Sequence, residues 1–242
     1  MRILPAALLV VGLAAPAATI VHAQGRAQAG AGTAQASLNR TADAILALKS
    51  TRFTLKREGT PAFLDEKNGI TFTQADCLYS APDRVSCDVK VSLKNGTIVQ
   101  LTRVWVPEGT FQTNPLTKQW AKVPPDANFN GALLFARTGI PDILRTGVQK
   151  QEIVASVMAN VAGQRAQRIK GEVRGDKLTP LVGATLKADA MYPVELWLDE
   201  KTGNPIQLHV SETDANGWLI QLSNFNEPVN IPTPQLPPPA GR

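Results

Sequence analysis

The feature that most constrains this fold is a strict alternation of apolar and polar side chains in three segments near the C-terminus. The apolar positions are Val194, Leu196 and Leu198, then Ile206, Leu208 and Val210, then Trp218, Ile220 and Leu222. Two short turn sequences, Thr202-Gly203-Asn204 and Ala215-Asn216-Gly217, separate these segments. Since successive side chains of a strand point to opposite faces, the pattern predicts an antiparallel meander with one buried face.

A hairpin is also predicted around the two cysteines of the chain, Cys77 and Cys87. The segments 70–79 and 85–93 have the composition of strands, and the turn sequence Ala81-Pro82-Asp83-Arg84 lies between them. Pairing these strands places the cysteines opposite or nearly opposite each other, which favours a disulfide that stabilises the fold by about 2–3 kcal/mol. The alternative is a redox-active pair, but the chain has no Cys-x-x-Cys motif.

Further segments extend the predicted sheet on both sides of the cysteine hairpin. Residues 52–58 alternate, with Phe53 and Leu55 on one face. Asn95-Gly96 is a strong hairpin turn, and it precedes a strand at residues 98–106. The apolar positions of that strand do not keep one phase, which indicates either a bulge or burial on both faces.

Helices are expected to be few. Helical spacing predicts them at residues 37–49, 140–144 and 178–191. Residues 24–36, rich in Gly, Ala and Gln, are expected to form a flexible leader, and residues 235–242 a Pro-rich tail. No repeat or linker divides the remainder, so the sequence predicts one α+β domain over residues 37–234, with a large antiparallel sheet and helices on one side.

The first 23 residues have the pattern of a secretory signal peptide. A basic start precedes an uncharged apolar stretch, residues 3–18, and Val21-His22-Ala23 fits the cleavage rule before Gln24. The chain is therefore expected to be exported to the periplasm, the cell envelope or the medium. The alternative is an uncleaved anchor, since the apolar run approaches the roughly 20 residues that span a bilayer. Two prolines interrupt that run.

The charged and polar residues argue against several classes of function. The formal net charge of +5 comes from scattered basic residues without interleaved aromatics, so no nucleic-acid partner is expected. Once His22 leaves with the signal peptide, His209 is the remaining histidine, and it lies on the polar phase of its strand. We expect no metal site, because one histidine is too few for a His-rich site and bridged cysteines cannot act as thiolate ligands. No motif for a nucleophile elbow, a P-loop or a dinucleotide is present, so we expect no cofactor and rank a hydrolase last.

Several stretches carry a family pattern. The most specific are VAGQRAQRIKGEV, YPVELWLDEKTGNPIQLHVSE and WLIQLSNFNEPVNIPTP, and the earlier LKSTRFTLKREG and GIPDILR appear in the same order. On these stretches the chain resembles the LppX/LprAFG family of bacterial envelope lipoproteins over residues 37–234. The resemblance implies a half-barrel, a large curved antiparallel sheet whose concave face is covered by helices, similar to the carriers LolA and LolB. It also implies a cavity for acyl chains and a role in moving lipids rather than catalysis.

The partner implied by the resemblance is an acylated lipid or glycolipid, with contact to a membrane surface, and the protein is expected to be a monomer. Members of the family typically carry a lipobox cysteine near the N-terminus, and this chain has none there. A soluble shuttle or a secreted lipid binder is therefore implied instead of a tethered lipoprotein.

The apolar phases of the predicted strands supply the candidate lining of the cavity. These positions are Phe53, Leu55, Phe72, Val89, Val91, Leu196, Leu208 and Ile220. Each is equally compatible with an ordinary core, because alternation reports only which face of a strand is apolar. The second functional hypothesis is a protein-binding module, such as a lipoprotein chaperone or a stress sensor on the same fold, which needs an exposed apolar patch.

The cleavage rule generates the first prediction. Intact-mass analysis of the exported protein should give Gln24, or its cyclised form, as the first residue, without acylation. Protein that keeps Met1 and fractionates with membranes would contradict this expectation.

Overall fold

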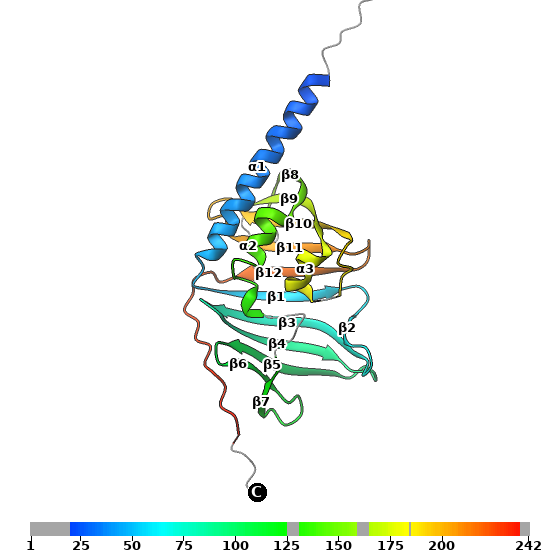
Figure 1. Ribbon diagram of the computed structural model, residues 1–242, viewed down its shortest axis with the longest axis vertical. Helices are drawn as coiled ribbons and strands as arrows, with labels where there is room; N and C mark the ends of the chain where they lie inside the picture. The colour runs from blue at the N-terminus through cyan, green and yellow to red at the C-terminus, as the bar shows by residue number, and fades with distance from the viewer. Residues whose placement is uncertain (1–19, 125–130, 159–164, 184, 238–242) are drawn as a thin grey trace, which may run out of the picture.

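The computed structural model describes residues 20–124, 131–158, 165–183 and 185–237 (Figure 1). Its body is one antiparallel sheet of twelve strands, in the order β7-β6-β5-β4-β3-β1-β12-β11-β10-β9-β8, with β2 beside β3. The strands are β1 (Ser50–Glu58), β2 (Ala62–Asp65), β3 (Ile70–Ser80), β4 (Arg84–Ser92), β5 (Ile98–Val106), β6 (Gly109–Thr113), β7 (Trp120–Val123), β8 (Gln149–Met158), β9 (Arg165–Arg174), β10 (Met191–Asp199), β11 (Pro205–Ser211) and β12 (Gly217–Ser223).

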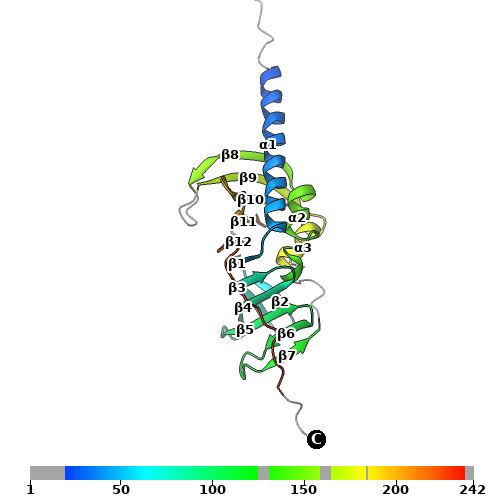
Figure 2. The same cartoon turned by 90° about the vertical axis from the view of Figure 1, so that its left-hand side faces the viewer.

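The helices lie on one side of this sheet, as Figure 2 shows for the three that it labels. They are α1 (Ile20–Leu46), the short 3-10 helix η1 (Gly131–Leu133), α2 (Ile140–Asp142), the π-helix η2 (Ile143–Gly147) and α3 (Gly175–Val182). The first part of α1 projects beyond the sheet (Figure 1). This arrangement confirms the predicted large curved antiparallel sheet with helices on one face.

The sheet consists of two meanders that meet in its middle. The first contains β1 and β3–β7, and the second contains β8–β12. They are joined by antiparallel pairing of the first strand with the last, from Arg52 opposite Ser223 to Glu58 opposite Gly217. The predicted meander of three alternating segments is confirmed as β10, β11 and β12, with Leu196 opposite Leu208 and Leu208 opposite Ile220.

The end of strand β5, at Val104, Trp105 and Val106, is buried on both faces, which was one of the two predicted alternatives. The pairing of β5 with β4 runs from Ser92–Ile98 to Val85–Trp105 without a register shift. Trp105 packs in the main core, whereas Val104 packs in a separate apolar cluster on the other face with Phe111 and Ile231. The second face is covered because the chain returns there after β12.

That returning segment, residues 224–237, has no helix or strand. Ile231 is 4% exposed, and Nη1 of Arg84 donates a hydrogen bond to its carbonyl oxygen at 3.0 Å. The segment therefore covers the outer face of the first meander. Of the predicted Pro-rich tail, residues 235–237 continue it without regular structure, and residues 238–242 lie outside the described residues.

Two sequence expectations about helices were wrong. Residues 24–36, expected to be a flexible leader, belong to α1, which runs without interruption past the predicted start at Ser37. Alanine is the strongest helix former and no proline interrupts this stretch, which allows the helix to continue through its glycines. The helix expected at residues 178–191 is the shorter α3, which ends before Gly183 because that residue takes a φ of +69°.

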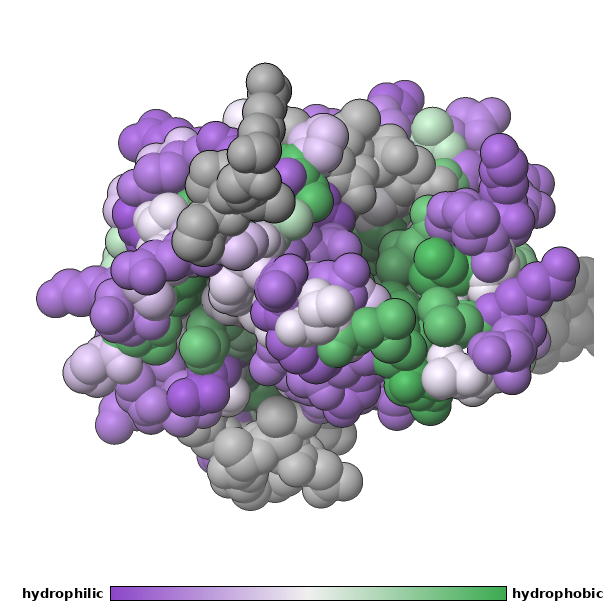
Figure 3. Space-filling model, turned by 90° about the horizontal axis from the view of Figure 1, so that it is seen from below, coloured by the Kyte–Doolittle hydropathy of each residue, from purple (hydrophilic) through white to green (hydrophobic). Residues whose placement is uncertain are grey.

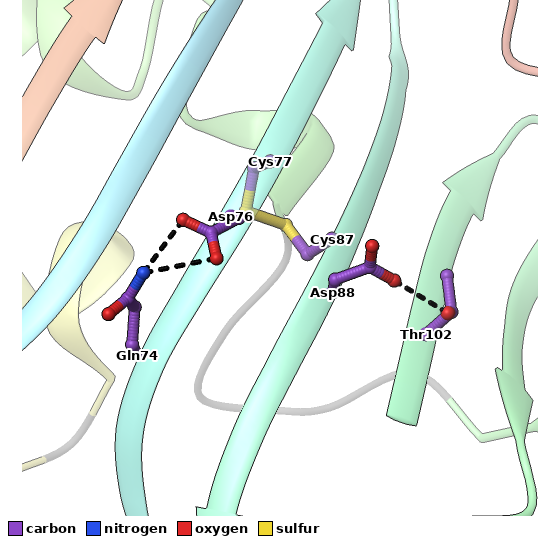
Figure 4. Close-up of a disulfide and its surroundings, with 6 residues drawn as sticks. All are labelled: Gln74, Asp76, Cys77, Cys87, Asp88 and Thr102. Carbon is purple, nitrogen blue, oxygen red and sulfur yellow. Dashed lines mark hydrogen bonds between the residues drawn. A yellow bond between two sulfur atoms is a disulfide. The ribbon is translucent and has the colours of Figure 1, made fainter. Parts of the chain in front are cut away.

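The cysteine hairpin is formed by β3 and β4, with Cys77 directly opposite Cys87 and the two bridged by a disulfide. Figure 4 shows the bridge with its polar neighbours Asp76 and Asp88. Oγ1 of Thr102 donates to Oδ1 of Asp88 at 2.7 Å. Both cysteines belong to the main core, so the bridge lies on the same face as the helices.

This bridge generates the second prediction. Free-thiol titration of the unfolded, unreduced protein should read near zero, and replacing both Cys77 and Cys87 by serine should lower the free energy of unfolding by about 2–3 kcal/mol, because the unfolded chain loses a short closed loop. Two reactive thiols in protein recovered from an oxidising compartment would contradict the bridge.

Candidate functional site

An apolar cavity of about 260 Å³ lies over the helix-bearing face of the first meander. Its floor comes from strands β1 and β3–β6, β2 and β12 contribute to its walls, and residues at the end of α3 form its roof. The lining residues are Phe53, Leu55, Phe63, Leu64, Phe72, Ala75, Cys77, Val89, Val91, Leu101, Arg103, Trp105, Gln112, Val182, Gly183, Thr185 and Trp218.

The strand register explains why these residues meet. In antiparallel pairs, directly opposed residues share a face, so a row of opposed residues crosses the sheet. One row contains Leu55, Ala75, Val89 and Leu101. The neighbouring row, about 7 Å away along the strands, contains Phe53, Cys77, Cys87, Arg103 and Gln112. The floor is therefore apolar along one row and becomes polar at the β5–β6 end of the other.

One wall of the cavity is an aromatic pair from distant parts of the chain. The rings of Phe72 and Trp218 lie 5.5 Å apart between centroids. The Trp218 indole N–H donates to Oε1 of Glu212 at 2.9 Å, and the guanidinium of Arg57 lies 5.1 Å from the ring centroid. Arg57 also donates to both carboxylate oxygens of Glu212. These contacts fix the orientation of the Trp218 ring, because both its polar edge and one of its faces are occupied.

Phe135, which follows η1, packs against the cavity residue Phe53. Its ring stacks on Tyr79 at 4.1 Å and meets Phe53 edge-on at 5.4 Å. Burial, with the nearby charge of Asp83, raises the pKa of the Tyr79 phenol, which donates to the carbonyl oxygen of Pro82 at 3.2 Å. Phe135 also lines a void of only about 10 Å³, which has room for about one water molecule.

The cavity opens beside β2. Phe63 and Leu64 line it and are nevertheless 54% and 56% exposed. Ile98, at the start of β5, is 65% exposed as well, but it lies on the opposite phase of its strand from the cavity residues Leu101 and Arg103. Figure 3 shows hydrophobic residues gathered on the right of the molecule as seen from below, the side on which β2 lies in Figure 1. The mouth is therefore rimmed by exposed apolar side chains.

The structure separates the eight candidate lining positions into three groups. Phe53, Leu55, Phe72, Val89 and Val91 line the cavity. Ile220 lines the 10 Å³ void instead. Leu196 and Leu208, 3% and 9% exposed, lie in the packed core on β10 and β11, outside the cavity lining. A role in ligand binding remains a prediction for every one of them.

Sequence reasoning missed several residues of the cavity. Phe63 and Leu64 lie in a four-residue strand, which is too short to reveal a phase. Arg103 lies in β5, whose double-sided burial hides the alternation. Trp218 was recognised as an apolar strand position, but its packing against Phe72 depends on the pairing of β1 with β12 and carries no local signal.

His209 lies on the other phase of β11 from the core residue Leu208 and is half-buried. Its Nε2 is 3.0 Å from Oε2 of Glu58, and its Nδ1 is 3.4 Å from Oγ of Ser211.

Across residues 20–237, leaving aside the undescribed stretches, no cluster of three or more His, Cys, Asp or Glu side chains forms a possible metal site. In the same part of the chain, no helix combines the length and the apolar character needed to cross a membrane.

Comparison with known proteins places this fold in a family. The family model described as LppX_LprAFG lipoprotein matches residues 33–231. The lipoarabinomannan carrier protein LprG of Mycolicibacterium smegmatis is 28% identical over 103 residues, which are 43% of this chain and 42% of that protein. The match thus spans less than half the length of this curated relative.

Two solved structures share the fold. LprF from Mycobacterium bovis superposes with a TM-score of 0.68 at 18% identity, covering 84% of this chain and 97% of that one. The Mycobacterium tuberculosis lipoprotein LppX gives a TM-score of 0.59 at 16% identity, covering 83% and 99% of the two chains. At these identities the similarity concerns the fold.

The contrast between cavity and core generates the third prediction. Leu196→Trp should lower the free energy of unfolding by about 1–3 kcal/mol, the usual cost of overpacking. Val91→Trp should cost less, because the added ring can enter the open volume beside Val91. Denaturant unfolding of both variants measures the difference. Equal losses would mean that the face around Val91 is an ordinary packed core.

Proposed function

This chain belongs to the LppX_LprAFG lipoprotein family, and on that premise we propose that it is a non-enzymatic lipid-binding or lipid-transfer protein of the cell envelope. The observation that carries the proposal is the apolar cavity with its exposed apolar mouth. The name of the relative, lipoarabinomannan carrier protein LprG, supports the same class of function.

The lining is suited to alkyl chains. Each methylene group transferred from water to an apolar environment contributes roughly 0.8 kcal/mol, and the floor row Leu55, Ala75, Val89 and Leu101 offers a continuous apolar surface. A volume of about 260 Å³ lies just below the range of roughly 300–1,000 Å³ typical of small-ligand sites. We therefore expect the cavity to hold about one acyl chain.

The rim explains how a lipid would enter. Phe63 and Leu64 line the cavity and expose large apolar side chains at its mouth. Contact of this rim with a membrane surface would let an acyl chain pass into the cavity without crossing water, where each exposed methylene is unfavourable. Export through the signal peptide, as the sequence predicts, would bring the protein to such a surface as a soluble carrier.

The second candidate function is a protein-binding module, such as a lipoprotein chaperone or a stress sensor. The same exposed residues, Phe63 and Leu64, favour it, because apolar patches rimmed by polar residues also mark protein interfaces. The two functions differ in their occupant: a lipid carrier holds ligand inside the cavity, whereas a protein-binding module uses the rim alone.

The fourth prediction tests the proposal by native mass spectrometry of gently purified protein. The wild-type chain should carry co-purifying lipid, and Val91→Trp should carry less, because the ring occupies part of the cavity that a chain needs. Lys90→Trp is the matched control. Lys90 lies on the opposite phase of β4, with its Nζ 3.7 Å from Oδ2 of Asp76, so its replacement should leave the bound lipid unchanged.

Two outcomes would count against the lipid-carrier function. A wild-type mass without bound lipid from several expression hosts would favour the protein-binding module. Equal lipid on the wild type and on Val91→Trp would mean that the lipid binds elsewhere.

A further inference from the structure

The cavity is not uniformly apolar. Among the described residues that line it, Arg103 is the only one with a charged side chain, and Gln112 and Thr185 add polar groups. Arg103 on β5 lies directly opposite Gln112 on β6, and on its other side it lies opposite Cys87 on β4. The two longest polar side chains of the lining therefore meet at one end of the floor.

The guanidinium of Arg103 is held in place by an aromatic ring. Its central carbon lies 5.2 Å from the centroid of the Trp105 ring, two residues further along the same strand face. Such stacking covers a face of the guanidinium, while its N–H donors point outward in the plane of the group. A guanidinium has five of these donors. It can therefore satisfy a contact with the protein and still donate to a ligand.

A cation beside an apolar cavity favours a particular ligand chemistry. Carboxylates and phosphates match the donor fork of arginine with two parallel hydrogen bonds. Beyond Arg103, the floor continues through Leu101, Val89 and Val91 toward Phe72, without a charged group among the described lining residues. The site thus offers an anion-binding end next to an alkyl-binding surface.

We propose that the cavity selects lipids that carry an oxyanion, a carboxylate or a phosphate, which docks on the guanidinium of Arg103 with the amide of Gln112 as a second donor. The alkyl chain then lies along the apolar rows toward β2. This inference rests on the proposed lipid-binding function and adds to it the charge of the ligand.

The test uses pairs of probes that differ only in charge. The delipidated full chain is titrated with cis-parinaric acid and with its methyl ester, followed by fluorescence. A second pair, dipalmitoyl phosphatidic acid and dipalmitoylglycerol, competes for the bound probe and distinguishes a phosphate from a carboxylate. The wild type should bind the anionic member of at least one pair about tenfold more tightly, as expected for a charge-assisted hydrogen bond.

Variants test whether Arg103 is the residue that causes the preference for the anionic probe. Arg103→Gln should remove it and leave the affinity for the neutral probe unchanged, whereas Arg103→Lys should keep part of it. Arg52→Gln is the control, because Arg52 is an exposed arginine on the other phase of β1 from the cavity residues Phe53 and Leu55, and it should bind like the wild type.

Three other results would overturn the oxyanion site or the lipid-binding function. Equal affinity of the wild type for charged and neutral probes would overturn the oxyanion site and leave the lipid-binding function intact. An Arg103→Gln variant that loses both probes equally would make Arg103 a support of the cavity wall and would also overturn the site. Failure of the wild type to bind any of the four probes would count against the lipid-binding function itself.

Discussion

The pairing of the first strand with the last is the interaction on which the other features of this molecule depend. Hydrogen bonding between β1 and β12 joins two meanders into one continuous sheet. It also brings Trp218, from the end of the chain, against Phe72, from the first meander. The cost of closing so long a loop grows only slowly with its length, and the buried row of opposed apolar residues, such as Phe53 with Leu222, offsets it.

On the helix-bearing face, the two meanders of the sheet are covered differently. Over the second meander, the packed helices fill the space, and residues such as Ile169 and Leu198 are fully buried. Over the first, Phe135 and the end of α3 cover the sheet only in part, and the cavity remains. The difference lies in what covers the strands, because strands of both halves, such as β1 and β11, carry an apolar phase on this face.

Whether a strand faces a packed core or a cavity could not be predicted from the sequence. Periodicity and turn residues correctly identified β10–β12 and the cysteine hairpin, because both signals are local. They could not separate Val89 and Val91 from Leu196 and Leu208, since an apolar phase is the same over a cavity and over a core. Arg103 was missed for a related reason: Ile231 returns from far along the chain to bury the outer face of β5, which removes the alternation that would have shown where Arg103 points.

The position of the disulfide in the cavity floor has a further consequence. Cys77 lines the cavity floor, and Cys87 lies between Cys77 and Arg103 in the same row. The redox state of the compartment in which the chain folds therefore affects the chemistry of the cavity floor as well as the stability of the fold. A chain folded in a reducing compartment would present two thiols where a chain folded in an oxidising compartment presents a bridge. Protein produced by these two routes would then differ in the surface of the cavity floor.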